Sequence, residues 1–386
     1  MNQGEEYVLT QGRFACPDGV HSGAWLRVHA GSIAEVGTGP PPAIEQHDLG
    51  GALVVPGFID MHCHGGGGAS FSTTDPDEAL RAVAAHRAHG TTTMLASLVS
   101  DPIPVLREQL RTLAAVTAQG ELAGIHLEGP FIAQSRCGAH DPQALREPTD
   151  ESVTELLTAA DEHLSMATIA PELAGGVKTI RRLAEAGVIP AIGHTDGSTE
   201  HMQQAADAGA TVATHLFNGM RPLHHREPGP VGVLLDDERV TVELIGDLVH
   251  VHPTALRLAA RHAGPNRTTL ITDAMSATDA PDGRYTLGRA EVDVRDGVAT
   301  LAENGALAGS TLTMDAAFRN AAIGAGLSVT EAVRATSGRP AELLGISHRT
   351  GAIRPGLAAD LVVLDDALRP TRVLRHGRRL GPDGRP

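Results

Sequence analysis

Aromatic side chains are scarce in this chain, which has one Trp, two Tyr and six Phe among 386 residues. The core must therefore be built mainly from Ala, Val, Leu and Ile, and the scarcity argues against a protein that stacks nucleic-acid bases on exposed rings. Positive charge is also in deficit, because the formal net charge is −15. We expect no nucleic-acid partner, since such binding neutralises phosphates with Lys and Arg. A small anion can still be held by a few local cations in a cleft.

Long apolar runs are absent as well. No stretch of about 18 apolar residues occurs, so we expect no membrane span. The first residues, MNQGEEYVLT, lack the basic start and apolar stretch of a signal peptide. Cysteine is limited to Cys16, Cys63 and Cys137, which are too few for a disulfide framework. Together these absences predict a cytoplasmic protein.

The middle of the sequence alternates short β-type runs with longer Ala- and Leu-rich helical patterns. Eight runs are expected as strands, at residues 58–61, 92–98, 123–127, 165–170, 189–193, 211–214, 240–245 and 269–272. Helical patterns between them include 76–89, 102–118, 152–160, 177–186 and 253–262. This alternation predicts an α/β fold, a (β/α)₈ TIM-type barrel at residues 58–350. A doubly wound sheet is less well supported, because no G-x-G-x-x-G follows the first strand.

The two ends of the chain have a different pattern. Residues 1–57 and 351–386 contain short β-like pieces separated by Gly and Pro. These pieces lie at 7–10, 25–29, 32–36, 52–55, 360–364 and 371–374. We expect both ends to build one small, discontinuous β-sandwich domain.

Metal-binding side chains stand where the predicted barrel strands end, and barrel active sites are built at these carboxyl ends. The first strand ends in His62-Cys63-His64, whose two imidazoles face the same way because alternate residues of an extended segment share a face. His126 is expected to line the barrel. The other strand-end candidates are Glu128, His194, His215 and Asp273.

This set of side chains predicts metal-dependent hydrolysis. Imidazole and carboxylate suit Zn²⁺ and comparable divalent ions, with a position left open for water. Such an ion lowers the pKa of its water and polarises a carbonyl. A carboxylate must then carry a proton from the water to the leaving amine, and Asp273 is the candidate. Five further histidines are expected to be ordinary surface residues: His86, His89, His163, His201 and His262.

Several segments resemble a known family. The string PGFIDMHCHGGGG at 56–68 is similar to the first barrel strand of the amidohydrolase superfamily, and GAIRPGLAADLVVLD at 351–365 to its small β domain. Other segments resemble N-acetylglucosamine-6-phosphate deacetylases: HLEGPFI at 126–132, GHT at 193–195, THLFNGM at 214–220, TDAM at 272–275 and LAGSTLTM at 307–314. The match runs in order over nearly the whole chain.

The resemblance implies Glu128, His194 and His215 as the principal metal ligands and Asp273 as the general acid/base. In the family, a glutamate after the third strand replaces the carbamylated strand-four lysine of many relatives. The fourth strand here agrees, since it runs into Ala-Pro-Glu at 170–172 and offers no lysine.

The His62 and His64 pair varies within the family. Members that lack the pair use one metal, and members that keep it can hold a second. One or two ions per chain are therefore expected. Zn²⁺ is preferred, and Fe²⁺, Mn²⁺ and Co²⁺ remain alternatives.

The resemblance also implies a site for a phosphorylated amino sugar. Asn218, the backbone of Gly219 and Arg226 correspond to family residues that hold the sugar phosphate, and this Arg often reaches in from the neighbouring subunit of a homodimer. A planar guanidinium suits phosphate because it donates two parallel hydrogen bonds. The remaining substrate-binding candidates are Ala139, His140, His250, Leu307, Ala308 and Gly309. Cys137 departs from the family, where Lys is more usual, and is either a plain solvent-facing residue or a redox-sensitive one.

The expected reaction is deacetylation of N-acetyl-D-glucosamine 6-phosphate to D-glucosamine 6-phosphate and acetate. The nearest alternative is an amidohydrolase with another N-acyl substrate, such as N-acetylgalactosamine 6-phosphate. Residues 218–226 argue against acyl amino acids and cyclic amides, but they do not separate the two hexosamine epimers. A non-enzymatic scaffold is disfavoured, because no expected ligand and no acid/base residue is lost.

Overall fold

The structure is a computed structural model that describes residues 6–385. The predicted barrel is confirmed: eight strands form one sheet in the order β15-β14-β13-β12-β11-β10-β9-β6, with parallel ladders from β9 to β15. The strands are β6 (Phe58–Asp60), β9 (Thr91–Leu98), β10 (Gly124–Glu128), β11 (Leu164–Ile169), β12 (Ile189–Ile192), β13 (Val212–Ala213), β14 (Thr241–Ile245) and β15 (Thr268–Ile271). Each overlaps the run predicted for it.

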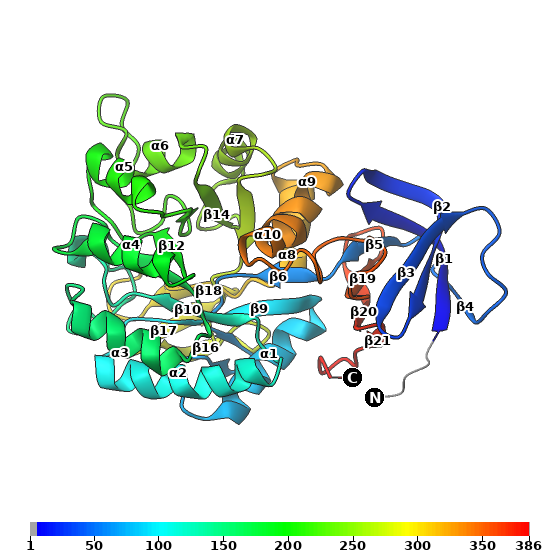
Figure 1. Ribbon diagram of the computed structural model, residues 1–386, viewed down its shortest axis with the longest axis horizontal. Helices are drawn as coiled ribbons and strands as arrows, with labels where there is room; N and C mark the ends of the chain where they lie inside the picture. Colours follow the sequence, from blue (N-terminus) through cyan, green and yellow to red (C-terminus); the bar gives the residue numbers. More distant parts are fainter. Residues whose placement is uncertain (1–5, 386) are drawn as a thin grey trace. The chain divides into compact units, whose positions relative to one another are not determined.

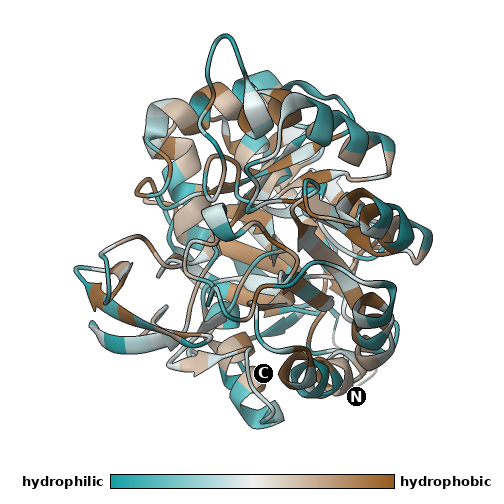
Figure 2. Ribbon diagram, turned by 90° about the vertical axis from the view of Figure 1, so that its left-hand side faces the viewer, coloured by the Kyte–Doolittle hydropathy of each residue, from teal (hydrophilic) through white to brown (hydrophobic). Residues whose placement is uncertain are grey.

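Helices alternate with these strands (Figure 1). They are α1 (Pro76–Ala88), α2 (Ile103–Ala118), α3 (Asp150–Ala160), α4 (Gly176–Glu185), α5 (Thr199–Asp207), α6 (Gly229–Asp236), α7 (Pro253–Ala263), α8 (Met314–Arg319), α9 (Val329–Val333) and α10 (Arg339–Leu343). A 3₁₀ turn lies at Gln134–Arg136, and π-helical turns lie at Asn320–Gly324 and Arg334–Gly338. The central strands are largely brown in Figure 2, whereas the outer helices carry many teal segments, as expected for helices that bury one face.

Local sequence signals explain where individual helices begin and which face they bury. Helix α3 starts with a capping box, in which the Thr149 and Ser152 side chains each accept a hydrogen bond from the other residue's backbone N–H. On α1, His86 is fully buried, so the prediction that it lies on the surface is wrong. The reason is helical periodicity, because His86 falls on the same face as the buried residues Ala79, Ala82 and Val83.

The last barrel strand meets the first through backbone contacts just beyond their ends. The Asp273 N–H donates to the His62 carbonyl at 2.9 Å, and the His64 N–H donates to the Ala274 carbonyl at 2.7 Å. Cys63 and Ala274 form a parallel bridge between these bonds. The closure therefore places the His62–His64 segment directly beside Asp273.

Both ends of the chain contribute to a second sheet, as predicted. It runs β21-β20-β19-β5-β1-β2-β3, with β4 paired to β1. The strands are β1 (Glu6–Cys16), β2 (Gly19–His29), β3 (Ser32–Thr38), β4 (Gln46–Asp48), β5 (Leu53–Pro56), β19 (Leu361–Leu364), β20 (Pro370–Arg375) and β21 (Arg378–Arg379). Phe14, Leu26, Ile33 and Leu361 are fully buried in its core.

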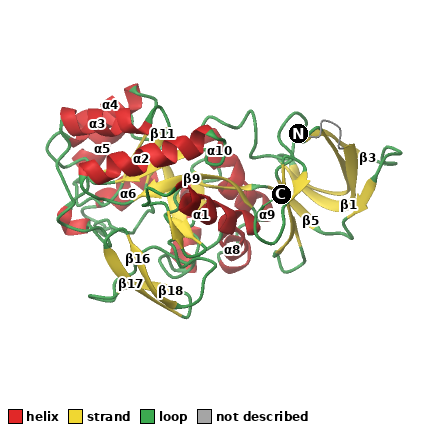
Figure 3. Cartoon of the chain, turned by 90° about the horizontal axis from the view of Figure 1, so that it is seen from below, coloured by secondary structure: helices red, strands yellow, loops and turns green. Residues whose placement is uncertain are grey.

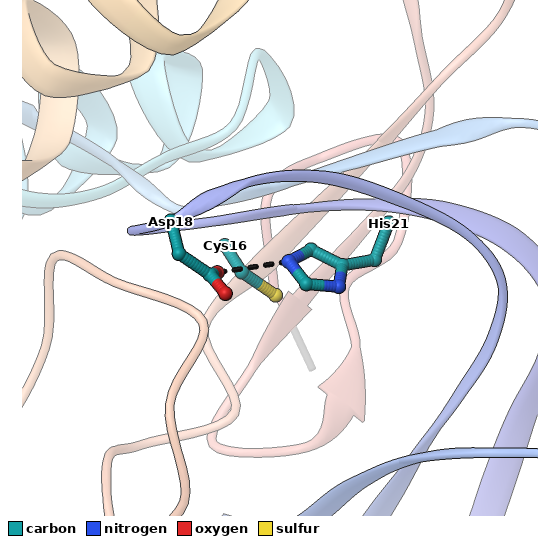
Figure 4. Close-up of side chains that lie close together, drawn as sticks. All are labelled: Cys16, Asp18 and His21. Carbon is teal, nitrogen blue, oxygen red and sulfur yellow. Dashed lines mark hydrogen bonds and ion pairs between the residues drawn. The ribbon is translucent and has the colours of Figure 1, made fainter.

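The turn between β1 and β2 brings Cys16, Asp18 and His21 together (Figure 4). His21 Nε2 lies 2.8 Å from Asp18 Oδ1, and this hydrogen bond lowers the pKa of Asp18. Burial, followed by the charge of Asp18, raises the pKa of the Cys16 thiol to about 11. The Asp–His pair closes the turn, and Cys16 remains a protonated thiol at neutral pH.

A three-stranded antiparallel sheet after the barrel was not anticipated. It consists of β16 (Gly283–Leu287), β17 (Ala290–Arg295) and β18 (Val298–Leu301), which are drawn in yellow in Figure 3. Asp296 and Gly297 join the last two strands, both with positive φ, at 51° and 72°. This Asp-Gly pair is a strong hairpin signal that the sequence did contain. Leu287 and Val292 pack with Val99 and Met275 in a small core of their own.

The chain divides into two compact units. One comprises the residues up to Asp60, Ala84–Thr93 and the residues from Met314 onward, and the other comprises Met61–Val83 and Met94–Thr313. A short hairpin of β7 (Gly65–Gly66) and β8 (Ala69–Ser70) lies in the second unit. Every metal-binding and substrate-binding residue predicted above belongs to the second unit. Among the described residues, none of the helices combines the length and apolar character needed to cross a bilayer.

Candidate metal centre

The carboxylate of Glu128, the last residue of β10, is the centre of the site. Its Oε1 lies 2.9 Å from His215 Nε2 and 3.1 Å from His194 Nε2. His194 comes two residues after β12, and His215 comes two residues after β13. The structure thus brings together the three residues predicted as principal metal ligands.

A second group of donors lies around the other oxygen of Glu128. Oε2 is 3.2 Å from His64 Nε2 and 3.5 Å from His62 Nε2. The Asp273 Oδ1 atom is 3.3 Å from His64 Nε2 and 3.5 Å from His62 Nε2, and the two Nε2 atoms are 3.1 Å apart. Because Glu128 belongs to both groups, the arrangement has the donors for two neighbouring ions that share one carboxylate.

Three of these residues have a backbone conformation that is uncommon outside glycine. The φ angles of His194, His215 and Asp273 are 48°, 27° and 50°. Such a conformation costs about 1–3 kcal/mol per residue and persists where surrounding structure enforces it, often at functional sites. Each of the three residues comes two positions after the end of a different barrel strand. The same backbone conformation in three separate turns therefore directs their side chains toward one point.

Hydrogen bonds to the far ring nitrogens orient two of the histidines. His64 Nδ1 lies 3.2 Å from the Ser97 carbonyl oxygen, and His194 Nδ1 lies 2.7 Å from the Arg136 carbonyl oxygen. A carbonyl only accepts, so each Nδ1 carries a proton, and when the ring is neutral its lone pair lies on Nε2. This is the tautomer that a metal-binding imidazole requires.

His140 has the opposite arrangement. Its Nδ1 accepts a hydrogen bond from the Ser100 backbone N–H at 3.1 Å, so the ring proton resides on Nε2. That Nε2 lies 3.3 Å from Glu128 Oε2 and donates to it. Burial lowers the pKa of His140 to about 4, so the ring is neutral at neutral pH. His140 therefore acts as a neutral hydrogen-bond donor in the cavity.

The two carboxylates are ionised although both are buried. Burial opposes the charged form, but the charge of His62 outweighs it and holds the pKa of Glu128 well below its usual range. The same balance, with a further hydrogen bond from His64, lowers the pKa of Asp273 to about 2. Two anionic oxygens beside several imidazole nitrogens form a donor set that fits a divalent ion such as Zn²⁺.

Most of the predicted substrate residues line one cavity above these donors. Besides His64, Glu128, His194, His215 and Asp273, the lining comprises Val99, Gly138, Ala139, His140, Asn218, Gly219, His250, Leu287, Leu307 and Gly309. The segment 307–309 lies next to Asp273, because the Ser310 N–H donates to the Asp273 carbonyl at 2.7 Å. Gly219 has no room for a side chain, since a Cβ there would lie 2.9 Å from His194 Nδ1.

Two predicted substrate residues lie elsewhere. Ala308 is buried in the small core beneath the three-stranded sheet, so only its neighbours 307 and 309 face the cavity. Arg226 is exposed and does not line the cavity of its own chain. It lies in an exposed segment in which Leu223 is 55% accessible.

His250 and Cys137 differ in how their surroundings affect ionisation. Burial lowers the pKa of His250, but the hydrogen bond from Nδ1 to Asp247 Oδ2 at 2.6 Å outweighs burial and raises it. Burial raises the pKa of the Cys137 thiol, which reduces its reactive thiolate at neutral pH. Cys63 is fully buried and lies between His62 and His64 in the sequence.

Sequence reasoning missed Glu243 on β14. Its side chain is fully buried, and Oε2 lies 3.3 Å from His62 Nδ1. The available signal was a glutamate in the middle of the apolar run TVELI, because a fully buried glutamate is rare unless it is paired. His126 does line the barrel interior, where its ring nitrogens lie 2.9 Å from the hydroxyls of Ser97 and Thr168.

Comparison with known proteins agrees with this geometry. The model of the amidohydrolase family matches residues 53–381. The chain is 36% identical over 377 residues to N-acetylgalactosamine-6-phosphate deacetylase of Escherichia coli, covering 96% of this chain and 98% of the relative. It is 39% identical over 336 residues to N-acetylglucosamine-6-phosphate deacetylase of Danio rerio, covering 83% and 82%.

Solved structures show the same likeness. One is an aspartate-to-alanine mutant of the N-acetyl-D-glucosamine-6-phosphate deacetylase of Mycobacterium smegmatis, in complex with N-acetyl-D-glucosamine-6-phosphate. It is 44% identical, with a TM-score of 0.95 over 97% of this chain and 99% of that one. The deacetylase of Thermotoga maritima is 32% identical, with a TM-score of 0.85 over 96% and 99%.

Proposed function

Because the chain belongs to the amidohydrolase family, we propose that it removes the acetyl group from N-acetyl-D-glucosamine 6-phosphate, giving D-glucosamine 6-phosphate and acetate. The observation that carries the proposal is the cavity itself. The cavity is lined by imidazole and carboxylate donors that could hold a metal ion. It is also lined by most of the residues that the resemblance assigns to binding of the amino sugar. N-Acetylgalactosamine 6-phosphate is the second candidate, since the relative named for it matches 96% of the chain.

We propose that Glu128, His194 and His215 hold one divalent ion, and that His62 and His64 hold a second with Asp273 and Glu128. A bound divalent ion lowers the pKa of water and polarises the acetyl carbonyl. Zn²⁺ suits these donors best, and Fe²⁺, Mn²⁺ and Co²⁺ accept them too.

The chain's own residues would move the proton and hold the substrate. Asp273 is ionised at neutral pH, so its carboxylate can take a proton from the attacking water and return it to the departing nitrogen. The neutral His140 offers its Nε2–H to an oxygen of the sugar, His250 also contacts the sugar, and Asn218 helps to hold the sugar phosphate. The 307–309 segment closes over the substrate with its backbone.

Acetate release tests the activity directly. We expect acetate from N-acetyl-D-glucosamine 6-phosphate, with much less from unphosphorylated N-acetylglucosamine, and we expect a chelator to abolish it. Metal removal matters because no protein group in the site replaces the Lewis acid. N-Acetylgalactosamine 6-phosphate, assayed in parallel, decides which epimer has the higher kcat/KM. A metal-loaded protein that releases no acetate from either phosphorylated sugar would disprove the proposed function.

Arg226 is proposed to bind the substrate phosphate of the neighbouring subunit in a homodimer. Its exposed position outside its own cavity supports this. Arg226→Ala is expected to raise KM for the phosphorylated sugar about 10- to 100-fold, because a charge-assisted hydrogen bond contributes about 1.5–3 kcal/mol. Arg239→Ala is the control, since Arg239 pairs with Asp207 and Asp237 of its own chain.

Hybrid dimers show which subunit supplies the arginine. One subunit carries Arg226→Ala and the other carries Asp273→Asn. If Arg226 acts across the interface, the subunit with an intact Asp273 receives the intact arginine of its partner and one site regains wild-type KM. If Arg226 acts within its own chain, no site in the hybrid has both residues and activity is not restored.

A further inference from the structure

Glu243 places a carboxylate in the interior of the barrel, behind the candidate metal centre. It is the middle residue of β14, and its side chain is fully buried. Burying a carboxylate without a partner costs several kcal/mol, so such a group persists only where it is paired or hydrogen-bonded. Among the described residues, the ion pair formed by Glu243 is with His62.

The contacts of Glu243 divide between its two oxygens. Oε2 lies 3.3 Å from His62 Nδ1 and also accepts a hydrogen bond from the His215 backbone N–H at 3.3 Å. Oε1 is buried and has no hydrogen-bond partner among residues 6–385. The interaction with His62 is therefore the one that Glu243 makes with a side chain that could bind a metal.

The contact determines which nitrogen of His62 is available. A carboxylate accepts a hydrogen bond, so Nδ1 carries a proton, and when the ring is neutral its lone pair lies on Nε2, the nitrogen left to bind an ion. That Nε2 is the atom that lies 3.5 Å from both Glu128 and Asp273. His64 obtains the same tautomer from the Ser97 carbonyl, a neutral acceptor. The two imidazoles of the pair are thus oriented by different kinds of partner.

We propose that Glu243 is the positioning residue of the second metal position, where its charge orients His62 and makes the imidazole a stronger ligand. Carboxylates that accept the second N–H of a ligand histidine have this effect on metal affinity. The inference rests on the proposed two-ion site. It names Glu243 as a residue on which binding of the ion at His62 and His64 depends. The first position should not depend on Glu243 to the same degree, because Glu243 contacts the backbone of His215 and not its ring.

The test is metal binding by the full-length protein, measured with Zn²⁺ by equilibrium dialysis and elemental analysis. The wild type is expected to hold two ions per chain at saturation. Glu243→Gln keeps the size of the side chain but removes its charge, so it should weaken the second ion about 10- to 100-fold and leave the first in place. Unchanged affinity for both ions in Glu243→Gln would overturn the inference.

Glu172→Gln provides the matched control. Glu172 accepts hydrogen bonds from the Thr195 hydroxyl at 2.5 Å and the Asp196 N–H at 2.7 Å, close to the ligand His194 but without contacting a ligand ring. Its neutralisation should leave both ions bound. In a His62→Asn background, where the second position is already lost, Glu243→Gln should have no further effect on metal content.

Folding and activity are kept separate from this measurement. Thermal unfolding of the metal-free proteins shows whether Glu243→Gln folds. If Glu243→Gln does not fold, Glu243→Asp takes its place, because the shorter side chain keeps the charge but moves it away from His62. A wild type that releases acetate but binds only one ion refutes the inference and leaves the deacetylase proposal standing. A wild type with two ions, of which Glu243→Gln loses one, supports the inference even if no acetate is released.

Discussion

Replacing Asp273 by asparagine is expected to lower kcat by about 10³-fold, within the range usual for removing a general acid/base. The substitution keeps the shape of the side chain and one oxygen that can accept a hydrogen bond. It removes the carboxylate, which its pKa of about 2 keeps in the ionised, proton-accepting form at neutral pH. An amide cannot accept and return that proton, so both attack by water and departure of the amine should slow.

The measurement is steady-state acetate release together with metal content. Asp273 Oδ1 lies within 3.5 Å of His62 Nε2 and His64 Nε2, so a loss of the second ion has to be distinguished from a loss of proton transfer. Assays at saturating metal make this distinction. Asp237→Asn is the control, because Asp237 pairs with Arg239 away from the cavity. Near-wild-type kcat in metal-loaded Asp273→Asn would refute the assignment.

The positions of the candidate metal donors could be predicted because they follow from strand periodicity. Once the runs at 123–127, 189–193 and 269–272 are recognised as strands of one barrel, their carboxyl ends must lie at one mouth. The alternation of an extended chain then turns His62 and His64 the same way, and the structure places their Nε2 atoms 3.1 Å apart. Both steps depend only on residues that are near each other in sequence.

What was missed depends on contacts between distant segments. Glu243 meets His62 across 181 residues, and nothing in the periodicity of TVELI indicates that partner. Leu287 reaches the cavity because the three-stranded sheet packs on Val99 and Met275. The strands themselves were predictable from the Asp-Gly turn at 296–297, but their place over the site was not. The tautomer of His140 likewise follows from the Ser100 N–H, which only the fold brings near.

Glu128→Gln should have the largest effect on metal binding of any single substitution in the site. Glu128 is the residue shared by both groups of donors: its Oε1 faces His194 and His215, and its Oε2 faces His62 and His64. Gln preserves the volume of the side chain, but it presents one neutral oxygen and an –NH₂ group that cannot bind an ion. Loss of a residue that only hydrogen-bonds to a metal ligand lowers metal affinity by up to roughly 100-fold. We expect Glu128→Gln to lower the affinity for both ions by more than this, and acetate release to disappear when the ions are lost.

Comparison of Glu128→Gln with His62→Asn tests whether Glu128 is a ligand of both metal positions. His62 belongs to the second group of donors, so His62→Asn should remove one ion and leave the other on Glu128, His194 and His215. If Glu128 bridges the positions, Glu128→Gln removes both ions at metal concentrations at which His62→Asn still holds one. If Glu128→Gln instead keeps one ion with wild-type affinity, the remaining histidines and Asp273 suffice to bind it. Glu128 would then serve a single position, and the shared-carboxylate arrangement would be wrong.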